Sequence, residues 1–386
     1  MVPIIGVLFF IFLNSVNTKL VPSEKSTLLL KPEPNNSEIK KPFFQPPEVV
    51  RAIYMTSWSA TKEDYIDYMI NLAKNTEINS VVIDIKDWSG YVAYDTKVPD
   101  VEIYDAKSIR IKNINSLIQK LHEEGIYVIA RITVFQDPRL AKARPDLAVH
   151  SKSKLAFAPF SSSTLWLDKS GLAWINPVVK TAWEYNIAIA KDAITQGFDE
   201  INFDYVRFPS DGDLKDMVFP LWDEKTPKHL VIKDFLKYLR QELPDAKLSI
   251  DFFGLSTVSF DNLGVGQVIE DAFEYFDYVC PMIYPSHYAD GFLGYQNPAE
   301  YPYEVVEYSM DGALKRLSSY QKPEERNAQL RPWLQDFDLG AIYDAEMVRS
   351  EIEAVYNVLG DNFRGFMLWN SLNIYTEEAF QSNGLK

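Results

Sequence analysis

The stretch EINFDYVRFP, residues 200–209, contains the pattern on which the fold prediction depends. Apolar and β-branched residues alternate there with polar ones, which is typical of a β-strand. Successive side chains of a strand point to opposite faces, so Asn202 and Asp204 share one face while Phe203 and Tyr205 share the other. We therefore predict a strand that buries its aromatic face against a helical layer and presents Asp204 on the opposite side.

Seven similar runs accompany this one, and helical patterns separate them. Alternating strands and helices predict a parallel sheet of βα units. An α/β fold of the (β/α)8 TIM-barrel type is expected over residues 48–386. The alternative is a doubly wound open sheet, but no glycine-rich phosphate-binding motif follows any of the runs. The eight predicted strands are residues 50–58, 78–87, 126–135, 200–208, 247–254, 277–284, 330–337 and 363–370.

Three helix starts are predicted from capping residues. Thr61 with Asp64 resembles a capping box, and Thr226 followed by Pro227 suggests a cap with proline at the first helical position. Asp344 precedes another apolar helical pattern.

The connection after the third predicted strand is long. About forty residues separate that strand from the helix beginning near Val178, and loops of such length in compact domains are usually functional. In a barrel this insertion would rise from the C-terminal rim, where active sites are built. It contains LWLDKSGLAWINP, residues 165–177.

The N-terminal segment indicates export. Residues 4–13, IIGVLFFIFL, form an unbroken apolar run that resembles the core of a signal peptide and is short for a transmembrane helix. Residues 1–18 are interpreted as a signal peptide or an uncleaved N-terminal anchor, which would tether the protein to a membrane. Residues 19–47 are rich in Pro, Ser, Lys and Glu and are predicted to be a flexible linker. Both alternatives place the barrel outside the cytoplasm, in the cell envelope or the extracellular space.

Composition excludes several classes of function. The net charge of -15 would repel phosphate backbones, so no nucleic-acid partner is expected. The single cysteine, Cys280, excludes an intrachain disulfide and a cysteine zinc knuckle. No cofactor or metal site is predicted, because the histidines are scattered at positions His122, His150, His229 and His287.

Asp204 is the central catalytic candidate. Its side chain is expected to point into the barrel mouth beside Asn202, with Arg207 just beyond the strand end. A carboxylate in that position suits the nucleophile of a glycosidase or the stabiliser of an oxocarbenium ion. The structural alternative is an Asp204–Arg207 ion pair that holds the loop.

Glycoside hydrolysis normally needs a second carboxyl group, and Asp251 is the favoured general acid. It lies on the next predicted strand among apolar neighbours, which would raise its pKa. The alternative is a structural polar residue of the barrel layers.

Asp84 and Lys86 share a face of the second predicted strand and are candidate substrate contacts. A salt bridge between them is the simpler interpretation. A Schiff-base lyase that uses Lys86 is a less favoured enzyme class.

Aromatic residues at strand ends and in the insertion suit the apolar faces of sugars, and neighbouring polar groups suit their hydroxyls. An oligosaccharide or polysaccharide is therefore the expected partner. A non-catalytic, cell-surface glycan-binding barrel remains the alternative to an enzyme. The aromatic candidates are Trp58, Trp88, Trp166, Trp174, Tyr284, Trp333 and Trp369, and the polar ones are Arg207, His287, Gln335 and Asn370.

Several motifs together resemble a bacterial family of glycoside hydrolases in the TIM-barrel superfamily. They are RAIYMTSW, VVIDIKDWSGYVAY, W-x-D-x-x-G-x-x-W-x-N-P, INFDYVRFPSDG, CPMIYPSHY and GFMLWN, which extend from about Val50 to Tyr375. The resemblance implies a nucleophilic aspartate at the end of the fourth strand, which Asp204 matches. This chain has Asn202 where the amylase-type pattern has arginine, and Asp251 where that pattern leads one to expect a glutamate acid.

Overall fold

A closed ring of parallel strands forms the centre of the fold. The computed structural model describes residues 47–320 and 328–382. β1 pairs in parallel with both β2 and β13, so the ring has no open edge. The predicted (β/α)8 barrel is therefore confirmed, and the open-sheet alternative is wrong. The ring strands are β1 (Val50–Met55), β2 (Ser80–Lys86), β5 (Tyr127–Thr133), β7 (Glu200–Asp204), β9 (Leu248–Phe253), β10 (Tyr278–Ile283), the pair β11 (Gln329–Leu330) and β12 (Trp333–Gln335), and β13 (Gly365–Trp369).

The seventh ring position is divided between two short strands. Both β11 and β12 pair with β10, and Arg331 and Pro332 lie between them. Proline has no N–H to donate to a neighbouring strand, which accounts for an interruption at this point. The single strand predicted over residues 330–337 is thus shorter and broken.

Ring closure requires a close approach of β13 to β1. Gly365 pairs with Val50 and has φ 103°, a backbone conformation that favours glycine. A Cβ atom at position 365 would lie 1.7 Å from the Val50 carbonyl oxygen. A side chain here would force the seam of the barrel apart.

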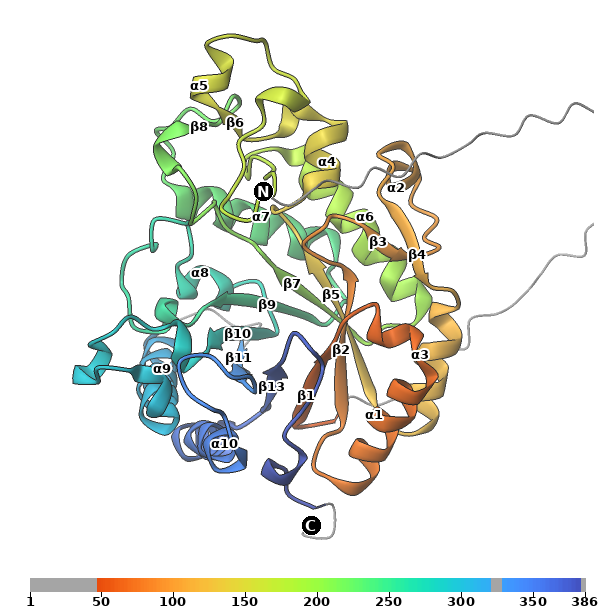
Figure 1. Cartoon of the computed structure of the whole chain (residues 1–386), viewed down its shortest axis with the longest axis vertical. Helices are drawn as coiled ribbons and strands as arrows, with labels where there is room; N and C mark the ends of the chain where they lie inside the picture. The colour runs from red at the N-terminus through yellow and green to blue at the C-terminus, as the bar shows by residue number, and fades with distance from the viewer. Residues whose placement is uncertain (1–46, 321–327, 383–386) are drawn as a thin grey trace, which may run out of the picture. The chain divides into compact units, whose positions relative to one another are not determined.

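Helices surround the ring, as Figure 1 shows. One apolar core fills the space between strands and helices, and a second lies inside the ring around Tyr54, Tyr127 and Trp333. The longer helices are α1 (Glu63–Asn75), α3 (Ile114–Glu123), α6 (Lys180–Gln196), α7 (Lys228–Glu242), α9 (Pro302–Ser319) and α10 (Ala345–Leu359), with the short α8 (Ile269–Phe273) before β10.

The capping predictions have mixed outcomes. Asp344 caps α10 by accepting a hydrogen bond from the Met347 N–H at 3.0 Å, which confirms that helix start. The N-caps of α1 and α7 are instead Lys62 and Pro227, and neither side chain caps its helix. Thr61 was predicted as a cap, but it is the last residue of a 3₁₀ turn, and its hydroxyl donates to the Trp58 carbonyl.

The long insertion after the third barrel strand is confirmed. It occupies residues 134–179 and contains α4 (Pro138–Ala143), β6 (His150–Ser151) and α5 (Lys152–Leu155). β6 pairs antiparallel with β8 (Met217–Val218) from the loop after β7, so the two loops form one structure, seen in Figure 1. A second excursion, unpredicted, follows β2 and comprises β3 (Val92–Tyr94), α2 (Pro99–Ile103) and β4 (Lys107–Ile111).

The predicted signal peptide or anchor, residues 1–18, lies outside the described residues, as does the linker 19–47 except for its last residue. Within residues 47–320 and 328–382, no helix is long and apolar enough to cross a membrane.

Candidate active site

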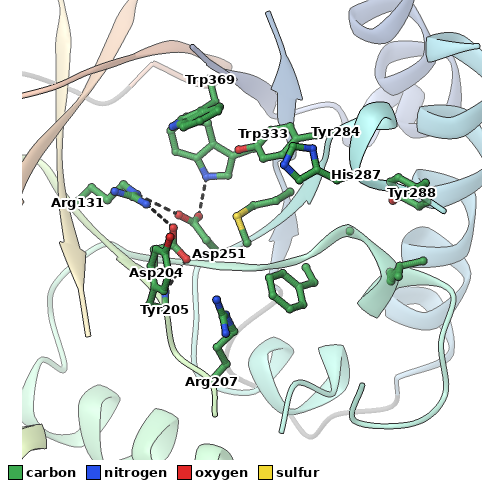
Figure 2. A pocket seen from close by; sticks show the side chains of 14 residues that line it. Arg131, Asp204, Tyr205, Arg207, Asp251, Tyr284, His287, Tyr288, Trp333 and Trp369 are labelled. Carbon is green, nitrogen blue, oxygen red and sulfur yellow. Dashed lines mark hydrogen bonds and ion pairs between the residues drawn. The ribbon is translucent and has the colours of Figure 1, made fainter. Parts of the chain in front are cut away.

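A cavity of about 440 Å³ opens at the carboxyl ends of the barrel strands. Asp204, Phe253 and Trp369 on its wall are the last residues of β7, β9 and β13. This is the end of a TIM barrel at which active sites are found. Figure 2 shows the fourteen lining residues: Arg131, Asp204, Tyr205, Arg207, Asp251, Phe253, Gly254, Leu255, Met282, Tyr284, His287, Tyr288, Trp333 and Trp369.

Asp204 faces this cavity, on the side that strand alternation predicts. One carboxylate oxygen, Oδ2, forms an ion pair with Nη2 of Arg131, and the other, Oδ1, accepts a hydrogen bond from the Tyr205 N–H. Both oxygens therefore have donors, and one donor is a cation.

Arg131, on β5, is the main residue that the sequence analysis missed. Its guanidinium contacts three carboxyl groups: Nη1 lies 2.5 Å from Asp84 Oδ1, Nη2 pairs with Asp204, and Nε lies 3.8 Å from Asp251 Oδ2. The alternative of an Asp204–Arg207 ion pair is wrong, because Asp204 pairs with Arg131 on the adjacent strand β5.

Asp251 stands beside Asp204 on the adjacent strand β9. The β7–β9 register pairs Asn202 with Ser249 and Phe203 with Ile250, so Asp204 and Asp251 occupy the next positions. Burial raises the pKa of Asp251 well above its usual value, and the negative charge of Asp204 raises it further, while Arg131 opposes both effects.

The hydrogen bonds of Asp251 reach one of its two carboxyl oxygens, and they lower its pKa against the larger effect of burial. Its Oδ1 accepts from Asn202 Nδ2 at 2.8 Å and from Trp333 Nε1 at 2.7 Å. Its Oδ2 has no hydrogen-bond partner among the described residues. Oδ2 is thus the oxygen that is left free to carry a proton.

Asp84 and Lys86 do not form the predicted salt bridge. A register shift in the β2–β5 pairing lies between these two residues, so they point to different environments. Asp84 accepts hydrogen bonds from Tyr54 and Arg131 inside the ring. Lys86 instead lies 2.8 Å from Asp137 and is fully buried. The prediction that Lys86 contacts substrate is therefore wrong. Asp84 does not line the cavity either, but it binds Arg131, which does.

Tyr205 breaks the strand alternation directly after Asp204. It was predicted to face the helices, but it lines the cavity. Its φ of 54° lies in the left-handed region, which a non-glycine residue rarely adopts and which often marks functional sites. This conformation ends β7 and turns the Tyr205 N–H back toward the Asp204 carboxylate.

Aromatic side chains form one wall of the cavity. Tyr284 and Trp369 lie 5.8 Å apart between ring centroids, and Trp333 lies beside them in Figure 2. His287 is on the same wall, and burial lowers its pKa, which favours the neutral imidazole. These four residues were predicted as sugar contacts, and their positions on the cavity suit that role.

Six other predicted sugar contacts lie away from the cavity. Trp58 and Trp88 are exposed on the surface, 61% and 55% respectively. Trp166, Trp174, Gln335 and Asn370 are buried, and their N–H groups donate to the protein itself, so direct contact with sugar is the wrong prediction for them. Four further residues line the cavity without having been predicted from the sequence, namely Phe253, Leu255, Met282 and Tyr288.

The described ranges contain no group of three or more His, Cys, Asp or Glu residues that could hold a metal ion.

A comparison with known protein families gives a match over most of the chain. The DUF4015 family, described as "Putative glycosyl hydrolase domain", matches residues 52–375. The chain belongs to this family. Its glycosyl hydrolase domain therefore comprises nearly the whole barrel. No match was found among curated protein sequences.

Three solved structures are similar to this glycosyl hydrolase domain. A hypothetical protein from Ruminiclostridium thermocellum ATCC 27405 is 36% identical over 55% of this chain and 98% of its own, with a TM-score of 0.46. The PgaB (BpsB) glycoside hydrolase domain from Bordetella bronchiseptica is 13% identical over 83% of this chain and 94% of its own, with a TM-score of 0.58. The α-galactosidase TtGalA from Thermus thermophilus is 12% identical over 86% of this chain but only 60% of its own, with a TM-score of 0.51. At these low identities the last two show a shared barrel fold.

Proposed function

We propose that the domain hydrolyses glycosidic bonds of an oligosaccharide or polysaccharide, with Asp251 as general acid and Asp204 as nucleophile or stabilising carboxylate. The observation that carries the proposal is the contrast between two neighbouring carboxyl groups. Asp204 is paired with Arg131, whereas the pKa of Asp251 is raised by burial. Carboxyl groups whose environments separate their pKa values are the usual acid and base of a glycosidase.

The proposed chemistry gives each of the two carboxyl groups one role. Asp251 gives its proton to the glycosidic oxygen, and the bond from that oxygen to the anomeric carbon breaks. Asp204 stabilises the positive charge or attacks the anomeric carbon, and water completes hydrolysis and restores the proton to Asp251. The rings of Tyr284 and Trp369 offer apolar faces against which a sugar can stack.

We further propose retention of the anomeric configuration. Neighbouring strands lie about 4.8 Å apart, and Asp204 and Asp251 occupy adjacent strands at one level. Such a spacing is nearer to the roughly 5 Å that is typical of retaining enzymes than to the wider gap of inverting ones. The product anomer, followed by NMR during the first turnovers, tests this point.

The activity test uses the full chain against a panel of cell-envelope and extracellular polysaccharides. We expect Asp204→Asn and Asp251→Asn each to lower kcat by about 10³-fold or more, because each removes one of two essential groups. The matched control is Asp311→Asn, which makes the same change in an exposed ion pair on α9. Hydrolysis by Asp204→Asn at the wild-type rate would refute the proposal, and binding without hydrolysis by the wild type would favour a glycan-binding barrel.

We also propose that the domain acts outside the cytoplasm. The support is the apolar run at residues 4–13 and the polar segment that follows it. Cell fractionation and N-terminal sequencing of the mature protein test export and distinguish cleavage from an anchor.

A further inference from the structure

Arg207 is a buried cation whose charge has no carboxylate partner. It lies three residues beyond Asp204, and only 8% of its surface is exposed. Its Nη1 donates to the Phe208 carbonyl at 3.2 Å and to Ser210 Oγ at 3.0 Å. Arg207 forms no ion pair with any residue in the described part of the chain. Buried charges are normally paired, so we expect Arg207 to bind an anionic group from outside the protein.

Three aromatic rings hold the guanidinium in place. Its central carbon lies 4.8 Å from the ring centroids of Trp174 and Phe253, and 5.1 Å from that of Tyr205. Aromatic faces attract a cation, but they do not satisfy the N–H donors at its edge. The rings therefore fix the orientation of Arg207 and leave the donors at Nε and Nη2 unused.

The unused donors belong to one edge of the guanidinium. Nε and Nη2 have no hydrogen-bond partner within residues 47–320 and 328–382. Neither atom is completely buried, so both are accessible to a ligand. Arg207 lines the cavity, and Figure 2 shows its guanidinium directed toward Asp204 and Tyr205. An arginine edge with two parallel N–H groups matches the two oxygens of a carboxylate.

The other cationic side chains on the cavity wall differ from Arg207. Arg131 already forms close ion pairs with Asp84 and Asp204. His287 has a pKa lowered by burial, which favours its neutral form. Of the described lining residues, Arg207 is thus the one that combines a fixed charge with free donors.

We propose that Arg207 binds the carboxylate of a uronic acid, so that the substrate of this cavity is an acidic polysaccharide. The inference rests on the proposed glycosidase function, since it names the substrate class of the same site. The free Nε–Nη2 edge would form two parallel hydrogen bonds to the sugar carboxylate, while the sugar ring lies within reach of Asp204 and Asp251.

Binding to the full chain tests the inference without requiring catalysis. The ligands are oligosaccharides of glucuronic, galacturonic and mannuronic acid, each compared by titration calorimetry with its carboxyl-reduced counterpart, which has the same linkages and no charge. We expect the wild type to bind at least one acid at least 10-fold more tightly than its reduced counterpart. Arg207→Gln should abolish this preference, and Arg207→Lys should keep only part of it, since lysine retains the charge without the paired donors.

Lys315→Gln is the matched control, because it removes one positive charge from an exposed site on α9 and should leave the preference intact. Thermal unfolding of each variant establishes that it is folded at the temperature of titration. A wild type without preference for any of the three acids, or a folded Arg207→Gln variant that keeps the wild-type preference, would overturn the inference.

Hydrolysis of the same oligosaccharides separates this inference from the proposed function. Acid-selective binding through Arg207 without cleavage by the wild type would leave the inference standing and refute the hydrolase. Cleavage of neutral glycans without acid-selective binding would support the hydrolase and refute the inference about Arg207.

Discussion

Replacing Arg131 by glutamine should destabilise the barrel strongly at neutral pH. The guanidinium pairs with Asp84 and Asp204 and lies 3.8 Å from Asp251, all of them buried. Its removal leaves buried carboxylates without a cation, and breaking a buried ion pair in this way costs about 3–5 kcal/mol. Glutamine can replace only part of the hydrogen bonding.

The cost should depend on pH in a defined direction. Burial raises the pKa of Asp84 and of Asp251, and Arg131 opposes the rise in both. Without Arg131 both pKa values move further up, so the folded variant binds protons at a higher pH than the folded wild type does. The unfolded chains bind protons alike. The loss of stability is therefore largest in alkaline solution and shrinks as the pH falls, by about 1.4 kcal/mol for each unit of additional pKa shift.

Urea unfolding at pH 5 and pH 8 provides the assay. The control is Lys315→Gln, whose ion pair with Asp311 is exposed and is expected to contribute about 1 kcal/mol or less. If Arg131→Gln unfolds within about 1 kcal/mol of the wild type at pH 8, the ion-pair reasoning is refuted. An equal loss at both pH values would refute the assignment of raised pKa values to the surrounding carboxyl groups.

Three further predictions concern single residues. Asp251→Asn should abolish hydrolysis yet become more stable relative to the wild type as the pH rises, since burial raises the pKa of Asp251 and its ionisation then opposes folding; urea titrations across pH measure this. Trp333→Phe removes a hydrogen bond that lowers the pKa of Asp251, so the alkaline limb of the kcat/KM profile should move to higher pH. Lys86→Met leaves the buried Asp137 without its cation and should lower the free energy of unfolding by about 3–5 kcal/mol. The kcat of the folded fraction should stay within about 3-fold of wild type, and a larger fall in kcat would favour the Schiff-base alternative.

The barrel and the direction of its catalytic face could be predicted from local patterns. Alternation within residues 200–204 places Asn202 and Asp204 on the inner face, and the structure confirms it through the hydrogen bond from Asn202 to Asp251. Periodicity works here because strand side chains alternate whatever the strand pairs with. It fails at Tyr205, where the left-handed backbone conformation ends the strand at Asp204, four residues before the predicted end at residue 208.

Pairing between strands could not be predicted in the same way. Asp84 and Lys86 are two residues apart, and simple alternation puts them on one face, but the register shift against β5 separates them. A bulge of this kind depends on the partner strand as much as on the strand itself. The error over the Asp84–Lys86 salt bridge is therefore an error of register.

Arg131 was missed for a related reason. Asp204 has a visible arginine three residues away in Arg207, whereas its true partner is separated from it by 73 positions in the chain. A signal was present, because Arg131 is the single charged residue of the apolar run IYVIARITVF. A charged residue in a strand that is otherwise buried needs a partner inside the barrel, and the acidic residues on adjacent strands were the available ones.

The two arginines explain why the long insertion belongs to this site. Arg131 is occupied by its ion pairs with Asp84 and Asp204. Arg207 is held by Trp174, which comes from the insertion. Trp174 is itself fixed by Asp168, whose Oδ2 accepts its indole N–H at 2.9 Å and whose Oδ1 accepts the N–H groups of Ser170 and Leu172, both at 2.9 Å. The motif W-x-D-x-x-G-x-x-W thus builds a rigid support for Arg207 and contributes nothing directly to Asp204 or Asp251. Changes in the insertion should accordingly alter which sugar is bound, while the position of bond cleavage stays with the barrel strands.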